Sequence, residues 1–441
     1  MKIAPCLAGL AVTAPLTLAQ DAVWPGFRGP TGDGVASSRP HPTSWTLDGD
    51  QRSNVGWVAD LPGAGWASPL IVGDTVIVAT AITDEFAPVG FMRKPGNPAE
   101  RVSGEVDFQI RAYSLSDGEM RWATSVAVRT PTQSSHPSNT FASETPVTDG
   151  KRVFAHFGAI GLLVAMDIQG EILWTKDMPS HPQKDGWGTA SSLALHDGTL
   201  IASSDNLVES FVTGYDVETG EEQWKRIRPT GSSWSSPLVI ERAAGDRLVL
   251  AGSECVITYE LPSGEERWRM TGIEGEFYST PVSDGERVYF GNSGFGRSGP
   301  LAAVDLDIVG EFVADAEADG VEWVVANQGF VFSSPILVDG ILYGQRTAAF
   351  VAHDAATGER IFRSRLPDRD LVVASPWVSG GVVYLLDESG STFALKPGRE
   401  FEILSTNEIS GDLFNATPAV GDGVLIIRGQ ERLYCIRTDA N

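Results

Sequence analysis

The sequence predicts an all-β fold, an eight-bladed β-propeller of four-stranded antiparallel blades, from three observations. One unit of sequence recurs along nearly the whole chain. Each unit holds three or four runs of strand length separated by turn residues, and no long segment shows the period of an amphipathic helix. Each unit apart from the last also ends on an aromatic residue. Because one four-stranded sheet cannot bury both faces, copies stacked radially into a ring give each blade a core.

The start of each unit is marked by a Ser/Thr-Pro step that is followed by apolar residues. These steps recur at intervals of roughly 45 residues, apart from two longer gaps that contain insertions near 84–106 and 310–320. In the third unit we take a serine to stand where the others have proline. The eight anchor positions are Pro69, Pro146, Ser192, Pro237, Pro281, Pro335, Pro376 and Pro418.

The end of each unit carries a turn motif, clearest at 214–224 and 352–362. In the first of these, Asp216 and Thr219 can bond to local backbone groups, and Gly220 tolerates a positive φ, so a tight hairpin is expected. The aromatic residue that follows is placed to pack on the next blade. This series comprises Trp57, Trp122, Trp174, Trp224, Trp268, Trp323, Phe362 and Phe401.

The two ends of the polypeptide are expected to share one blade. The last unit, 413–437, stops before its terminal aromatic strand, and residues 54–59 supply such a strand upstream of the first anchor. We therefore predict a single propeller domain over 54–441, with the ring closed by an N-terminal strand.

The N-terminal segment reads as a signal peptide over 1–20, followed by a strap over 21–53. Lys2 precedes a mostly small or apolar run, and Thr17 and Ala19 offer small residues before a cleavage point. The protein is therefore expected to be exported, periplasmic or secreted, without a membrane span. Cys255 and Cys435 fall in different units, so we expect two separate buried thiols.

The composition disfavours one class of partner. The protein has 33 Lys and Arg against 57 Asp and Glu, a net charge of −24. Such a surface repels a phosphate backbone, so nucleic-acid binding is not expected.

The turn motif resembles the tryptophan-docking repeat of the pyrroloquinoline quinone (PQQ) propellers. That superfamily includes the quinoprotein alcohol dehydrogenases and the non-enzymatic BamB-like scaffolds. The segment 24–34 is similar to the N-terminal signature of PQQ-like repeat proteins. Membership of the enzyme branch would imply bound PQQ and calcium and an adjacent Cys-Cys pair. The sequence has no such pair and no haem-attachment motif, which favours the non-catalytic branch.

The position before each anchor always carries a hydroxyl group, and these positions are expected to begin the innermost strands. They are Ser68, Thr145, Ser191, Ser236, Thr280, Ser334, Ser375 and Thr417. One position earlier, seven residues are small and the eighth is Glu144. We therefore expect Glu144 to place one charge in the central channel, as a ligand or cation contact or as a solvated carboxylate with no role.

A further position earlier, four aromatic residues recur. They are Trp66, Trp234, Tyr278 and Phe332, with Trp187 nearby. At the mouth of a propeller they would stack on a planar ligand or on a partner's side chains, or else pack between blades.

The leading prediction is a monomeric, non-catalytic propeller of the cell envelope that binds a protein or peptide and requires no cofactor. One mode of binding would add a partner strand to a blade edge. The first alternative is an oxidoreductase of alcohols or sugars with PQQ and calcium held near Glu144 and Trp234. The second is a carbohydrate-binding or sensing propeller that uses the same aromatic residues.

Overall fold

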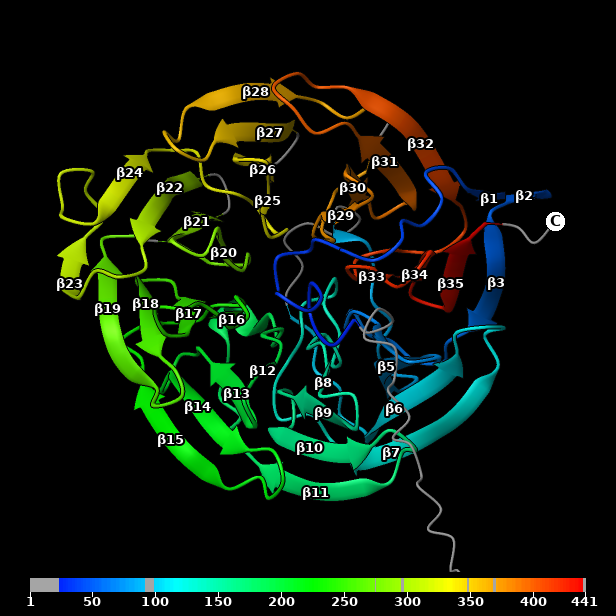
Figure 1. Ribbon diagram of the computed structural model, residues 1–441. Helices are drawn as coiled ribbons and strands as arrows, with labels where there is room; N and C mark the ends of the chain where they lie inside the picture. Colours follow the sequence, from blue (N-terminus) through cyan, green and yellow to red (C-terminus); the bar gives the residue numbers. More distant parts are fainter. Residues whose placement is uncertain are drawn as a thin grey trace, which may run out of the picture.

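The computed structural model describes residues 24–91, 99–273, 275–294, 297–346, 349–367 and 370–438, without the side chains of 293–298. The predicted signal peptide lies outside these residues. Eight small sheets stand around a ring (Figure 1), which confirms the eight-bladed β-propeller. No helix in the described part of the protein is long and apolar enough to cross a membrane.

The first four blades follow sequence order from the innermost strand outward. Blade one contains β4 (Leu70–Val72), β5 (Thr75–Ile82), β6 (Val106–Ser114) and β7 (Met120–Arg129). Blade two contains β8 (Val147–Thr148), β9 (Arg152–Phe157), β10 (Leu162–Asp167) and β11 (Ile172–Asp177). Blade three contains β12 (Ala194–His196), β13 (Thr199–Ser204), β14 (Phe211–Asp216) and β15 (Glu222–Ile227). Blade four contains β16 (Leu238–Ile240), β17 (Arg247–Ala251), β18 (Cys255–Glu260) and β19 (Glu265–Thr271).

The next two blades repeat the pattern. Blade five contains β20 (Val282–Ser283), β21 (Arg287–Gly294), β22 (Arg297–Asp305) and β24 (Val321–Val325). Its insertion forms β23 (Gly310–Val313), which pairs in parallel with β19 at the outer edge of blade four. Blade six contains β25 (Ile336–Val338), β26 (Ile341–Arg346), β27 (Ala349–Asp354) and β28 (Arg360–Ser364).

The last two blades incorporate the N-terminal part of the sequence. Blade seven contains β29 (Trp377–Ser379), β30 (Val382–Leu386), β31 (Ser391–Leu395) and β32 (Ile403–Ile409). At its outer edge, β1 (Thr46–Asp48) and β2 (Gln51–Ser53) extend the sheet. Blade eight contains β33 (Ala419–Val420), β34 (Val424–Arg428), β35 (Arg432–Arg437) and β3 (Val55–Asp60). The antiparallel pairing of β3 with β35 confirms that an N-terminal strand closes the ring.

The aromatic residues of the outer strands pack on the next blade. Trp57 lies against Gly118, where an added Cβ would come within 2.6 Å of the indole ring. Gly118 also has a φ of +78°. Both the close approach of the indole and this left-handed conformation therefore favour glycine at this position. The Trp57 Nε1–H donates to the Leu115 carbonyl at 2.9 Å. Equivalent bonds join Trp122 to Ile168, Trp174 to Val217 and Trp323 to Ala355.

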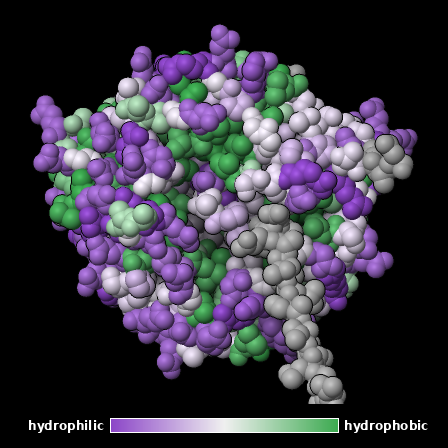
Figure 2. Space-filling view, in the orientation of Figure 1, coloured by the Kyte–Doolittle hydropathy of each residue, from purple (hydrophilic) through white to green (hydrophobic). Residues whose placement is uncertain are grey.

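The N-terminal segment crosses the ring before it reaches blade seven (Figure 1, dark blue). Trp24 exchanges backbone hydrogen bonds with Ile71 in blade one, and Pro25 accepts one from Thr148 in blade two. Farther along, the side chain of Arg28 donates to Pro335 beside blade six. Val35 then pairs with Val378 in blade seven. In the same view, Figure 2 shows hydrophobic side chains gathered around the hollow centre of a largely hydrophilic disc.

Cys255 on β18 and Cys435 on β35 are both buried and unpaired. They lie in blades four and eight, as the spacing of the repeat predicts. The core of the blades, rather than a disulfide between these two residues, therefore holds the ring together.

Candidate functional site

A ring of hydroxyl groups lies at the start of the innermost strands. Each hydroxyl oxygen accepts the backbone N–H of the equivalent residue in the preceding blade, at 2.9–3.0 Å. The seven bonds thus connect all eight blades in sequence, from Ser68 in blade one onward. We call this set the hydroxyl ring: Thr145, Ser192, Ser236, Thr280, Ser334, Ser375 and Thr417.

The third blade corrects the predicted register by one residue. The hydroxyl ring contains Ser192, not Ser191, and Leu193 stands where the other blades have proline. Ser191 points elsewhere, because its Oγ bonds to the Ser203 hydroxyl at 2.8 Å and donates to the Ser235 carbonyl at 2.9 Å. Without the proline, two adjacent serines fitted the sequence pattern equally well.

The hydroxyl ring opens into a cavity of about 960 Å³, which we call the mouth cavity. All seven hydroxyl residues line it, and so does Phe27 from the strap. The four aromatic residues predicted for the mouth, Trp66, Trp234, Tyr278 and Phe332, line it too. The structure therefore brings these four together. Trp187, which the sequence placed nearby, lines it as well, and so does Phe91 from the insertion; both lie outside the repeat register.

Five of these rings form one continuous surface, the aromatic wall: Phe91, Trp187, Trp234, Tyr278 and Phe332. The ring centroids of Trp187 and Trp234 are 5.4 Å apart, and those of Trp234 and Tyr278 are 5.2 Å apart. Phe332 continues the wall at 5.4 Å from Tyr278 and 4.8 Å from Phe91. Trp234 and Tyr278 are nearly parallel, with 15° between their planes. Such a wall offers both stacking and edge contacts to an apolar or aromatic group.

The loops that precede the innermost strands hold these rings in place. The Trp234 Nε1–H donates to the Gly188 carbonyl at 2.7 Å, and the Trp66 Nε1–H donates to the Ser138 carbonyl at 2.9 Å. Phe332 has a φ of +62°, a left-handed conformation that is unusual for a bulky residue. Backbone strain of this kind clusters at binding sites.

The mouth cavity has few ionisable groups. Among its described lining residues, Asp185 is the one carboxylate and His136 the one imidazole, and there is no lysine or arginine. Burial lowers the pKa of His136. The buried Tyr278 hydroxyl has no hydrogen-bond partner among the described residues, and burial raises its pKa. These groups offer hydrogen bonds to a ligand but no reactive pair.

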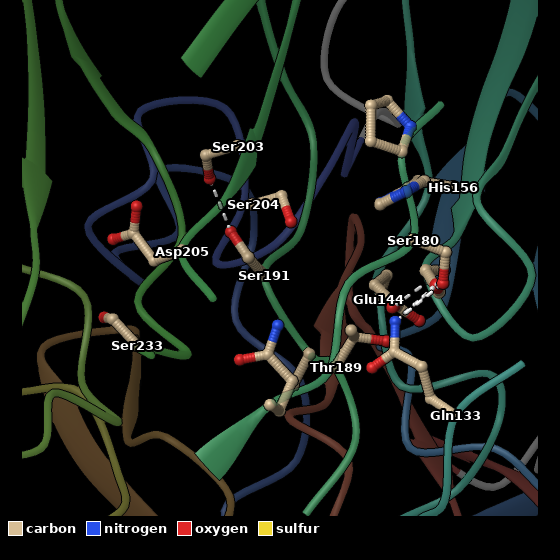
Figure 3. Close-up of a pocket in the computed structure, with 14 residues that line it drawn as sticks. Gln133, Glu144, His156, Ser180, Thr189, Ser191, Ser203, Ser204, Asp205 and Ser233 are labelled. Carbon is tan, nitrogen blue, oxygen red and sulfur yellow. Dashed lines mark hydrogen bonds between the residues drawn. The ribbon is translucent and has the colours of Figure 1, made fainter. Parts of the chain in front are cut away.

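Glu144 lies outside the mouth cavity, which corrects the expectation that its charge faces the channel. It is 2 % exposed and lines a separate pocket of about 20 Å³, room for about one water molecule. The Gly158 N–H donates to its Oε1 at 3.1 Å, and burial raises its pKa to about 6. Figure 3 shows Glu144 beside Gln133 and Ser180, with Asp205 on the opposite side of the pocket. Glu144 and Thr145 precede β8 and face different sides, since Thr145 lines the mouth cavity and Glu144 lines the separate pocket.

The described lining residues supply few carboxylate ligands for a calcium-dependent quinone site. Calcium is bound by six to eight oxygen ligands, with carboxylates prominent among them. The described lining supplies one carboxylate, Asp185, and Glu144 is turned into another pocket. Elsewhere, the possible metal-ligand atoms of His196, Asp197 and Asp246 lie within 4.8 Å of one another. None of these three residues lines the mouth cavity.

A sequence-family model described as outer membrane protein assembly factor BamB matches residues 43–207, 208–307 and 291–441. No curated protein matches the sequence. Among solved structures, BamB from Moraxella catarrhalis aligns with 81% of this chain and 98% of its own, at 15% identity and a TM-score of 0.54. Quinohemoprotein alcohol dehydrogenase from Comamonas testosteroni aligns with 97% of this chain and 82% of its own, at 11% identity and a TM-score of 0.62. Sqt1 from Saccharomyces cerevisiae aligns with 91% of this chain and all of its own, at 10% identity and a TM-score of 0.56. At such identities these structures share the fold alone.

Proposed function

Because this chain belongs to the family described as outer membrane protein assembly factor BamB, we propose that it is a non-catalytic binding propeller of the cell envelope. In this proposal it acts as an exported monomer, periplasmic or secreted, and holds a segment of a partner protein in the mouth cavity. It needs no cofactor for this task.

The aromatic wall carries the proposal. A cavity of about 960 Å³ lined by five adjoining rings can bury apolar side chains of a peptide segment. Clustered aromatic side chains in a pocket are typical of the residues that dominate binding energy at protein interfaces. The exposed surface of the described lining residues is mostly apolar, so the contact is an apolar one in the main.

Phe91 supplies an internal example of such a contact. It comes from the insertion between β5 and β6, and its ring packs on Phe332 and lies 5.8 Å from His136. Phe332 of the wall thus already receives an aromatic side chain presented by a loop. A partner's loop or terminal segment would use the same surface.

The structure bears differently on the two alternative functions, the quinone-dependent oxidoreductase and the carbohydrate-binding propeller. The calcium-dependent quinone site lacks its set of carboxylate ligands among the described lining residues, so we derive no reaction from it. A sugar ring could stack on Trp234 and Tyr278, and the binding of glycans in place of peptides would favour that function over the one proposed.

The proposal is tested by selecting peptides from a displayed library on the purified protein and measuring their affinity by fluorescence anisotropy. We expect selected peptides rich in aromatic residues, with affinity reduced at least tenfold in Trp187→Ala. Leu173→Ala is the control, because Leu173 is 51% exposed on outer strand β11. Equal loss in both variants, or loss in the control alone, would place binding on the blade edge and refute the mouth as the site.

A further inference from the structure

The hydroxyl ring keeps its hydrogen atoms available. Each of its seven oxygens accepts one backbone N–H, and none donates its hydrogen to another atom of the described residues. A hydroxyl group both accepts and donates, so each retains a donor after its inter-blade bond is made. All seven residues line the mouth cavity. That end of the cavity therefore presents a circle of hydroxyl donors, which a ligand with hydrogen-bond acceptors would satisfy.

A buried guanidinium lies next to this circle. Arg28 is fully buried, and its Nη2 donates to the carbonyls of Asp33 and Pro335. Pro335 directly follows Ser334 of the hydroxyl ring. The Arg28 Nε lies 3.5 Å from the position of a Cβ built on Gly34, and the carbonyl of Pro376, which follows Ser375, lies 3.0 Å from it. The guanidinium thus contacts the residue that follows Ser334 in blade six and lies near the residue that follows Ser375 in blade seven.

The charge of Arg28 is not matched by an ion pair. Its Nε and Nη1 are buried and have no hydrogen-bond partner among the described residues. Burial lowers the pKa of Arg28 to about 10, and the charge of Asp33 offsets this only in part. A buried cation with unused donors is costly unless an acceptor or a negative charge lies nearby. Arg28 itself does not line the mouth cavity, so its positive charge favours an anion at the hydroxyl ring through space and not by direct contact.

The strap determines how a ligand can enter. It crosses the ring from blade one to blade seven, and its Phe27, the neighbour of Arg28, lines the mouth cavity. A peptide segment that reaches the hydroxyl ring meets the strap there, and so must present a terminus or a loop tip. A peptide's C-terminus brings two acceptor oxygens and a negative charge, whereas an N-terminal ammonium brings donors and a positive charge.

We propose that the partner enters the mouth cavity by its C-terminus, a proposal that rests on the proposed function. The terminal carboxylate accepts hydrogen bonds from the hydroxyl ring above Arg28, and the apolar side chains of the last residues pack on the aromatic wall. The site thus recognises a free C-terminal carboxylate together with an aromatic or large apolar terminal residue. Capture of a terminal carboxylate by an array of donors is a known mode of peptide recognition.

The test compares two forms of one probe, a fluorescein-labelled Gly-Ser-Gly-Ala-Phe peptide with a free C-terminal acid and with a C-terminal amide. We expect the acid to bind at least tenfold more tightly than the amide, by fluorescence anisotropy. Equal affinities, both lost in Trp187→Ala, would overturn the carboxylate site and leave the proposed function standing. Binding of neither form would overturn both.

Variants of the hydroxyl ring test whether the preference for the acid form arises there. Ser375→Ala and Thr417→Val each remove one donor, and we expect each to reduce the preference for the acid form several-fold. Ser68→Ala is the matched control, because Ser68 has the same position in its repeat but does not line the cavity. Thermal melting checks that each variant is folded. If phenylacetate displaced the acid peptide at the same concentration as unlabelled peptide does, the site would belong to small carboxylic acids and the proposal of a peptide end would be wrong.

Discussion

The backbone N–H of Phe91 donates to Oε1 of Glu388 at 2.8 Å, which joins the insertion of blade one to blade seven. Glu388 is buried, and its own backbone N–H donates to the Leu371 carbonyl. This bond fixes the backbone of Phe91 where its ring packs on Phe332. The protein's own phenylalanine therefore covers part of the Phe332 ring, a surface that we assign to the partner.

Removal of the Phe91 ring should strengthen partner binding. In Phe91→Ala the area of Phe332 that Phe91 covers becomes available, so we expect the affinity for aromatic peptides to rise about threefold, equivalent to about 0.6 kcal/mol. Leu207→Ala, at a 58% exposed position in the loop between β13 and β14, is the control. Weaker binding by Phe91→Ala would mean that Phe91 contacts the partner rather than competing with it.

The ring should depend on Trp57 for its closure. This residue lies on β3, the strand that joins the two ends of the polypeptide in one blade. Trp57→Ala removes a buried indole and its bond to Leu115, so the free energy of unfolding should fall by about 3–5 kcal/mol. Urea denaturation measures this change. Leu404→Ala, 48% exposed on β32, should change it little, and an equal loss in both would contradict a special role for β3.

His41 should make the protein less stable in acid. Its Nδ1 donates to the Pro42 carbonyl at 2.8 Å and its Nε2 accepts the Trp377 Nε1–H at 3.2 Å, within a cage that includes Trp45 and Tyr384. Burial lowers the pKa of His41 to about 4. The stability contributed by the neutral ring is therefore complete above the unfolded pKa of about 6.5 and is lost as the pH falls toward 4.

The expected loss between pH 6.5 and 4 is about 3 kcal/mol for this one group. It is measured as the difference between urea denaturation curves at several pH values. His41→Gln should flatten that dependence by a similar amount, whereas His181→Gln, at a half-exposed position, should leave it unchanged. A pH dependence that is identical in the His41 variant and the parent protein would show that His41 does not carry it.

Glu144 should affect stability and not binding. Because burial raises its pKa to about 6, its contribution is favourable when it is protonated and is lost as the pH rises through 6. Glu144→Gln keeps the shape without the charge, so at pH 8 the variant should be more stable by about 2 kcal/mol. Peptide affinity should be unchanged, because Glu144 does not line the mouth cavity. A tenfold loss of affinity would place Glu144 in the binding site after all.

The architecture could be predicted from the sequence because each unit of the repeat carries the residues that its hairpin and its packing on the next blade require. Gly118 is needed where the Trp57 ring approaches, and the same pairing of glycine and tryptophan recurs from blade to blade. The closing strand followed from the missing aromatic strand of the last unit. Within one unit the glycine and the aromatic residue lie a few residues apart, as Gly118 and Trp122 do, so the motif can be recognised in a single sequence.

The site was predicted less completely. The four aromatic residues before the anchors share one repeat position, and they meet at the mouth for that reason. Glu144 was misplaced because neighbouring residues before β8 face different cavities, and its position in the repeat does not show which one it faces. Phe91 and Trp187 reach the wall from an insertion and a short 3-10 turn (η3, Lys184–Gly186), which no repeat position could indicate.

The most direct test of the mouth cavity as a binding site is photo-crosslinking. A selected peptide that carries benzoylphenylalanine at its aromatic position is irradiated with the protein, and the attached residues are identified by mass spectrometry. We predict attachment to the residues that line the mouth cavity, Trp187, Trp234 and Tyr278 among them. Attachment confined to the outer strands, such as β7 or β11, would contradict the assignment and place the partner on a blade edge.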